Sequence, residues 1–167
     1  MTLRRLAWIL VVGGVVIWLS GLFTPRSTVN CWTKDVDITT GRIRSQYFFL
    51  YMPVWKKIED HEITKVLEPS DLAGKTPHWR RVVTFSPTSP NYSPQYSFGN
   101  AIRHMHMLRD CWERAEFTPA AKRESAKRLL QMWQTSGRCT SEDYDYLDAM
   151  RELSSRRRPV DVNDLPK

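Results

Sequence analysis

The sequence lacks the motifs that most enzymes use. It contains no G-x-S-x-G, H-E-x-x-H, P-loop or G-x-G-x-x-G pattern, and its 7 glycines offer few positions for a phosphate cradle. We therefore expect a non-catalytic protein with no catalytic residues, no cofactor and no identifiable small-molecule substrate.

Cysteine is scarce as well. The three cysteines, Cys31, Cys111 and Cys139, are odd in number and widely spaced. This spacing excludes the C-x-x-C redox motif and the C-x-x-C-H haem attachment site. In an oxidising compartment one disulfide is expected and one thiol remains, but the spacing does not select the pair.

Charge is absent from the stretch Leu6–Phe23, LAWILVVGGVVIWLSGLF. About 18 residues make roughly 27 Å of helix, close to the ~30 Å hydrocarbon core of a bilayer. The alternatives are a cleaved signal peptide and a buried helix of a soluble core. Because the run exceeds the usual signal core and no A-x-A-like site follows it, the sequence predicts a retained transmembrane anchor.

Basic residues lie closer to the front of this run than to its end. Arg4 and Arg5 precede it, whereas Arg26 and Lys34 follow. The positive-inside rule then predicts a cytoplasmic N-terminus and an extracytoplasmic C-terminal domain. The expected location is the inner membrane, and the expected partners are the lipid bilayer, through Leu6–Phe23, and other membrane or envelope proteins.

The chain as a whole is basic, with 25 Lys and Arg, 18 Asp and Glu, and a net charge of +7. Part of this charge lies in the run RRRP over residues 156–159, which opens a polar segment without apolar periodicity. The run lacks the interleaved aromatics of a nucleic-acid groove, so we expect a disordered tail and no nucleic-acid partner.

Strand patterns occupy the first half of the remaining chain. Residues 31–38 and 42–51 alternate apolar and polar side chains around a turn that contains Gly41, which predicts a β-hairpin. Residues 54–67 place Ile58, Ile63, Val66 and Leu67 for a short helix that Pro69 closes, and residues 78–85 are typical of another strand. Pro87, Pro90 and Pro94 then predict an extended connection.

Helical patterns follow. Over residues 100–115 an apolar stripe runs opposite a polar face; the stripe consists of Ile102, Met105, Leu108, Trp112 and Ala115, and the polar face of Arg103, His106, Asp110 and Glu113. Thr118 and Pro119 begin a second helix that ends near Gly137. Thr140 with Asp143 caps a third, which carries Leu147, Met150 and Leu153.

The expected fold class is therefore α+β, with an N-terminal transmembrane helix, a small antiparallel sheet and about three C-terminal amphipathic helices. The predicted divisions are a cytoplasmic N-terminus (1–5), the anchor (6–23), a linker (24–30), an extracytoplasmic α+β domain (31–155) and the basic tail (156–167).

The hairpin carries a resemblance. In DVDITTGRIRSQYFF the residues Asp35, Asp37, Thr40, Gly41, Arg42 and Arg44 stand around a T-G-R-x-R turn. This resembles the hairpin of uncharacterised bacterial single-pass membrane proteins, which place an N-terminal anchor ahead of an [ST]-G-R-x-R turn. The match covers about 40 residues, and it implies membrane topology only, since that group has no established activity.

One helix face and one acidic cluster combine side chains that can bind metal ions. His104, Met107 and Cys111 stand at i, i+3 and i+7, and these soft donors favour copper. The alternative is that these side chains serve no metal: some would pack in the core, and others would lie on the solvent-exposed face of the helix. The cluster EDHE over residues 59–62 is assigned to a solvated face, because four consecutive residues cannot converge on one point.

The sequence therefore favours a membrane-anchored, non-catalytic interaction protein or accessory subunit of a cell-envelope assembly. A periplasmic copper-handling protein that uses His104, Met107 and Cys111 is the alternative.

Overall fold

The computed structural model describes residues 3–19, 30–49, 52–85, 95–96, 98–156 and 159–166. Its elements are α1 (Leu3–Leu19), β1 (Asn30–Asp37), β2 (Ile43–Phe49), β3 (Met52–Glu59), α3 (Glu62–Lys65), α4 (Pro69–Leu72), β4 (Trp79–Phe85), β5 (Gln95–Tyr96), α5 (Ala101–Arg114), α6 (Pro119–Ser136), α7 (Ser141–Leu153) and the 3₁₀ helix η1 (Val162–Asp164).

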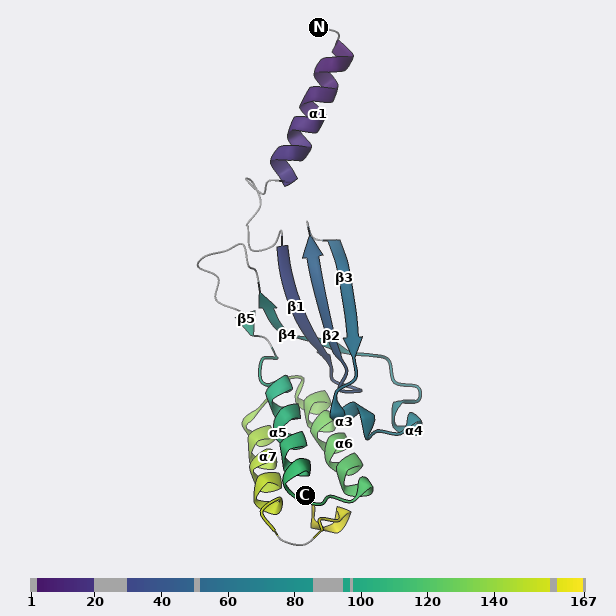
Figure 1. Cartoon of the computed structure of the whole chain (residues 1–167), viewed down its shortest axis with the longest axis vertical. Coiled ribbons are helices and arrows are strands. Elements are labelled where there is room, and N and C mark those ends of the chain that lie inside the picture. The colour runs from purple at the N-terminus through teal and green to yellow at the C-terminus, as the bar shows by residue number, and fades with distance from the viewer. Residues whose placement is uncertain are drawn as a thin grey trace.

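The architecture is α+β. The strands form one antiparallel sheet in the order β3-β2-β1-β4-β5, so that β3 and the two-residue β5 lie at its edges. Helices α5, α6 and α7 gather beneath one end of the sheet, and α1 lies beyond the other end (Figure 1). Much of the sheet therefore extends past the helical core.

The predicted hairpin is confirmed, and a buried aspartate organises its turn. β1 pairs with β2 in the register Val36↔Ile43. The Asp37 carboxylate accepts hydrogen bonds from the Thr39 backbone N–H (3.0 Å) and the Thr40 hydroxyl (2.6 Å). Gly41 closes the turn at φ 74°, a left-handed conformation that disfavours other residues.

The core joins the turn end of the sheet to the three helices. From the sheet side it receives Val36, Ile38, Ile63 and Val82, and from the helices it receives chiefly Met105, Leu108, Trp112, Leu129, Leu130, Trp133, Leu147, Met150 and Leu153. The buried face of α5 also contains His104 and Cys111, so core packing applies to two of the three predicted metal donors. That face follows the spacing 101, 104, 105, 108, 111 and 112, and Ile102 and Ala115 lie at its margin.

The predicted caps of the next two helices are confirmed. Thr118 accepts a hydrogen bond from the Ala121 N–H at the start of α6, and Gly137 ends that helix. At the start of α7, Asp143 accepts a hydrogen bond from the Thr140 N–H at 2.6 Å. These caps satisfy backbone groups that the helix ends leave unpaired.

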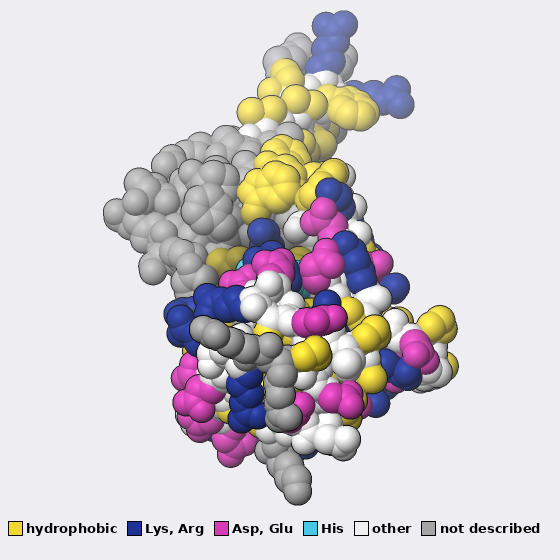
Figure 2. Space-filling view, turned by 60° about the horizontal axis from the view of Figure 1, so that its bottom comes forward, with side chains coloured by type: hydrophobic (Ala, Val, Ile, Leu, Met, Phe, Trp, Pro, Cys, Tyr) yellow, Lys and Arg dark blue, Asp and Glu magenta, His cyan; other side chains and the backbone are white. Residues whose placement is uncertain are grey.

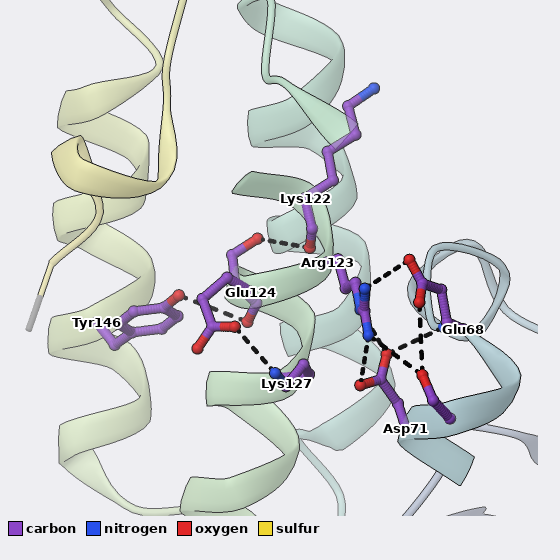
Figure 3. A network of polar contacts seen from close by, with 9 residues as sticks. Glu68, Asp71, Lys122, Arg123, Glu124, Lys127 and Tyr146 are labelled. Carbon is purple, nitrogen blue, oxygen red and sulfur yellow. Dashed lines mark hydrogen bonds and ion pairs between the residues drawn. The ribbon is translucent and has the colours of Figure 1, made fainter. Parts of the chain in front are cut away.

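A network of ion pairs joins the short helix α4 to α6 (Figure 3). Arg123 on α6 contacts Glu68 at 2.5 Å and Asp71 at 2.6 Å. The hydrogen bond from Arg123 lowers the pKa of Asp71 to about 2. On the same helix, Glu124 pairs with Lys127 at 3.1 Å.

The helix predicted over residues 54–67 is wrong in its first half. Residues 52–59 form β3, which pairs with β2 through Tyr47↔Trp55 and Ile43↔Glu59. Only Glu62–Lys65 is helical there, and Pro69 starts α4 instead of ending a helix. Pairing with β2 decides the matter, because an edge strand tolerates proline and lysine.

The prediction of a transmembrane anchor is also wrong. Within the ranges that the structure describes, no helix is long and apolar enough to cross a membrane. The described helix α1 runs from Leu3 to Leu19 and includes Arg4 and Arg5 in its first turn. The apolar part of this described helix measures roughly 21 Å, short of the ~30 Å hydrocarbon core, so the predicted inner-membrane location is not supported.

The described part of the C-terminal segment packs against the domain. Val160 is 1% exposed and forms a parallel bridge with Phe117. η1 follows it, capped by Asp161. The segment that the sequence assigns to a disordered tail therefore carries structure from residue 159 to 166. The proline-rich connection over 86–94 lies outside the described residues.

Candidate functional site

Three side chains with metal-binding donors converge inside the helical end of the protein. They are His104 on α5, Cys139 in the α6–α7 connection and Asp143 in the first turn of α7. One donor atom from each residue lies within 4.8 Å of the other two. The shortest separation given by the structure is 4.0 Å, between His104 Nδ1 and Asp143 Oδ2. Three segments distant in sequence thus form one polar cluster.

The cluster is buried but its hydrogen bonding is incomplete. His104 and Asp143 are fully buried, and Cys139 is half-buried. Neither ring nitrogen of His104 has a hydrogen-bond partner in the described part of the chain, and the same is true of Asp143 Oδ1. Buried polar groups are nearly always paired, because an unpaired one costs about 1 to 3 kcal/mol.

Aromatic rings line the imidazole of His104. The Trp133 ring stacks on it with centroids 6.3 Å apart, and the Tyr144 ring meets it edge-on at 4.5 Å. These contacts restrict the plane of the imidazole, and one of its nitrogens lies within 4.8 Å of donor atoms of both Asp143 and Cys139.

Burial favours the uncharged form of all three groups. It lowers the pKa of His104 to about 4 and raises the pKa of Cys139 to about 12, to which the Asp143 charge also contributes. Burial likewise raises the pKa of Asp143, against the hydrogen bond from the Thr140 N–H. The Trp133 indole N–H also favours the charged carboxylate, although it forms no well-aligned hydrogen bond there. The Cys139 thiol is therefore a poor nucleophile by itself.

The sequence-predicted trio is divided between two places. His104 joins the buried cluster, whereas Met107 and Cys111 line a separate depression together with Arg103, Asp110, Arg114, Leu147 and Arg151. All three cysteines are free thiols, so the single disulfide that the sequence allowed is not formed.

Cys139 and Asp143 were missed because each has a simpler interpretation in the sequence. Asp143 reads as a helix cap, which it is, and Cys139 reads as an isolated thiol. Their spacing of four residues could have indicated the site, because it brings the two side chains close together at the start of a helix. His104 joins these two residues only because α5 packs against α7.

A pair of histidines lies between the start of α3 and α5. His61 Nε2 is 3.5 Å from His106 Nδ1, and His61 Nδ1 accepts the Ile63 N–H that begins α3. Burial, and then the His106 charge, lower the pKa of His61 to about 4. The assignment of the EDHE cluster to a solvated face is thus wrong for His61, which is buried.

The part of the sheet beyond the core exposes apolar side chains. Trp32, Tyr47 and Trp55 lie on neighbouring strands, with ring centroids 4.8 Å and 5.3 Å apart between Trp32 and the other two. A depression of about 340 Å³ beside them is lined by Trp32, Thr33, Lys34, Ser45, Trp55 and Val83. Figure 2 shows charged side chains of both signs over the helical end and hydrophobic ones gathered toward α1.

The edge strand β3 completes this apolar surface. All eight of its residues are exposed; Trp55 pairs with Tyr47 on the aromatic face, whereas Ile58 pairs with Arg44 on the opposite face. Because β3 is an edge of the sheet, no strand among the described residues lies beside one side of its backbone. An exposed edge of this kind is a template for pairing with another strand.

Comparisons with models of protein families, with curated proteins and with solved structures found no match. The resemblance of the hairpin to uncharacterised bacterial proteins therefore stays a prediction, and the candidate sites are the buried polar cluster and the exposed sheet edge.

Proposed function

We propose that this protein is a non-catalytic interaction module that binds an extended, acidic segment of a partner protein along β3. The observation that carries the proposal is the edge position of β3 together with the exposure of all eight of its residues. Addition of a strand to such an edge gains affinity from backbone hydrogen bonds and specificity from alternate side chains.

The apolar anchors for the added strand are in place. Trp55 on β3 and Trp32 on β1 are each 42% exposed, and both line the depression on the sheet. Burying an aromatic side chain of this size commonly dominates the energy of an interface. An extended peptide presents every second side chain to one face, so an apolar residue at alternate positions matches this surface.

Charge indicates an acidic partner. Lys34 lines the depression, and Lys56 and Lys57 lie on β3. Lys57 pairs with Glu59 at 2.6 Å, whereas neither Lys34 nor Lys56 forms an ion pair with any residue that the structure describes. A second copy of this chain would bring the same lysines together and shares the net charge of +7, so the acidic segment is favoured over a homodimer.

The test is a selection of displayed random peptides of about ten residues, a full strand length, against the full-length protein. We expect the selected peptides to alternate apolar residues with Asp or Glu, and their affinity to fall as salt is added. Trp55→Ser should weaken binding by about 30-fold, as for the loss of a central anchor. Val162→Ser removes a similarly exposed apolar side chain on η1, so it serves as the control and should bind normally.

Two further outcomes discriminate between mechanisms. Methylating alternate backbone nitrogens of a selected peptide should abolish binding if the peptide pairs with β3. Undiminished binding by the methylated peptide, selection of no peptide that depends on Trp55, or a dimer in sedimentation equilibrium that Trp55→Ser dissociates would each overturn the proposal.

A further inference from the structure

The buried polar cluster at the helical end has the geometry of a ligand set. A single imidazole nitrogen of His104 lies within 4.8 Å of both the Cys139 sulfur and an Asp143 carboxylate oxygen. In a Cys-His-Asp catalytic arrangement the thiol and the carboxylate sit on opposite ring nitrogens. Here the thiol and the carboxylate lie near the same ring nitrogen, as they must if all three groups bind one ion.

The distances are within reach of coordination. Bonds of about 2.0 to 2.3 Å to a tetrahedral zinc ion place its ligand atoms roughly 3.3 to 3.8 Å apart. Closing the cluster from its present spread of up to 4.8 Å therefore takes a movement of about 1 Å. Cys139 lies in the connection between two helices, where the backbone adapts more readily than within a helix.

The donors select the class of ion. One nitrogen, one sulfur and one oxygen suit a borderline divalent ion such as Zn²⁺, whereas a carboxylate is a poor ligand for Cu(I) and a thiolate is a poor ligand for Ca²⁺ or Mg²⁺. A thiolate and a carboxylate also balance the two charges of the ion. Coordination would thus bury no net charge in a site that is otherwise apolar and aromatic.

We propose that His104, Cys139 and Asp143 bind a zinc-type divalent cation and thereby clamp α5 to the start of α7. The cation would engage a fully buried histidine whose two ring nitrogens are unpartnered among the described residues. Three protein ligands leave a fourth position, and Cys139, the half-buried member, marks the side from which solvent reaches it.

A buried water is the competing explanation for the unpartnered histidine, since water also satisfies polar groups in protein interiors. It does not account for the thiol, a weak hydrogen-bond partner, beside the carboxylate and the imidazole. The two explanations differ in a measurable way, because only a metal site converts the Cys139 thiol to a thiolate ligand.

The test uses the full-length protein, treated with a chelator and then titrated with Co²⁺ as a spectroscopic substitute for zinc. We expect thiolate-to-cobalt charge-transfer absorption and the visible bands of a four-coordinate ion, saturating at one equivalent. Zn²⁺ should displace the cobalt, because a d¹⁰ ion loses no ligand-field energy on entering a tetrahedral site. Added Zn²⁺ should also raise the midpoint of thermal unfolding.

Variants locate the site. Cys139→Ser should abolish the charge-transfer band, whereas Cys31→Ser, which removes a half-buried thiol in β1, should leave it intact. Asp143→Asn keeps an oxygen that can accept the Thr140 N–H and so preserves the cap, but it should weaken Co²⁺ binding by more than about 100-fold. Circular dichroism confirms that each variant folds.

No cobalt absorption in the chelator-treated protein would overturn the proposal. So would a band that survives Cys139→Ser, or a dissociation constant unchanged by Asp143→Asn. None of these results bears on peptide binding at β3.

Discussion

Replacing Gly41 by alanine tests how the hairpin turn packs against α3. A Cβ atom at this position would lie 3.0 Å from both Ile63 Cγ1 and Ile63 Cδ1, and 3.2 Å from Thr64 Oγ1. Ile63 and Thr64 are both buried, so neither side chain has free space into which it can withdraw. The new methyl group therefore adds crowding to an unfavourable backbone conformation.

The magnitude follows from three contributions. A left-handed conformation costs a non-glycine residue roughly 1 to 2 kcal/mol, and overpacking a core typically costs a further 1 to 3 kcal/mol. Alanine also lowers the conformational entropy of the unfolded chain, which stabilises the folded protein by about 0.4 to 1 kcal/mol. Gly41→Ala should thus lower the free energy of unfolding by about 1 to 4.6 kcal/mol, with a midpoint of ~3 kcal/mol.

Gly74 provides a matched control. Its φ of 72° is nearly that of Gly41, yet nothing lies within 4 Å of a Cβ placed there. Gly74→Ala therefore carries the conformational cost without the crowding and should lose only about 1 kcal/mol. The difference between the two variants isolates the contact with Ile63 and Thr64.

Urea unfolding of the full-length protein, followed by circular dichroism, measures both variants on one scale. The reasoning requires the midpoint of Gly41→Ala to fall well below that of Gly74→Ala at an unchanged slope. Equal losses in the two variants would refute it, since the turn would then not be packed on α3.

Three further perturbations test the polar groups of the fold. Asp35→Asn should lower the free energy of unfolding by about 2 kcal/mol in urea melts, because it removes the buried partner of two partly exposed arginines; no loss would mean that these pairs contribute nothing. Arg123→Ala should raise the pKa of Asp71 from about 2 toward 3.8 in an NMR titration, and an unmoved pKa would contradict the network in Figure 3. In the wild type, stability should fall as pH drops from 6.5 toward 4, because unfolding lets His61 and His104 take up protons that the fold excludes. His61→Asn retains an acceptor for the Ile63 N–H but cannot titrate, so its melts should fall less over this range; parallel curves would assign the pH dependence elsewhere.

Several elements were predictable because their signals are local. The turn at Gly41, the caps at Thr118 and Thr140, and the apolar periodicity of α5 act within a few residues of the chain. Local backbone chemistry sets such features wherever the segment comes to lie. The sequence by itself therefore determined the hairpin and the three C-terminal helices, and with them the pairing of a small sheet with a helical core.

Tertiary structure decided the rest. The residues of β3 include Pro53 and two lysines and fit a short amphipathic helix about as well as a strand, until β2 supplies the backbone partners. The apolar run at the N-terminus has the composition of a membrane anchor, but the extent of α1 limits what it can span. The sites depend on the same distant contacts: β3 is an edge only because of the strand order, and His104 meets Cys139 and Asp143 only because α5 packs against α7. Contacts between residues 35 or more positions apart leave no periodic trace in a single sequence, so packing alone establishes them.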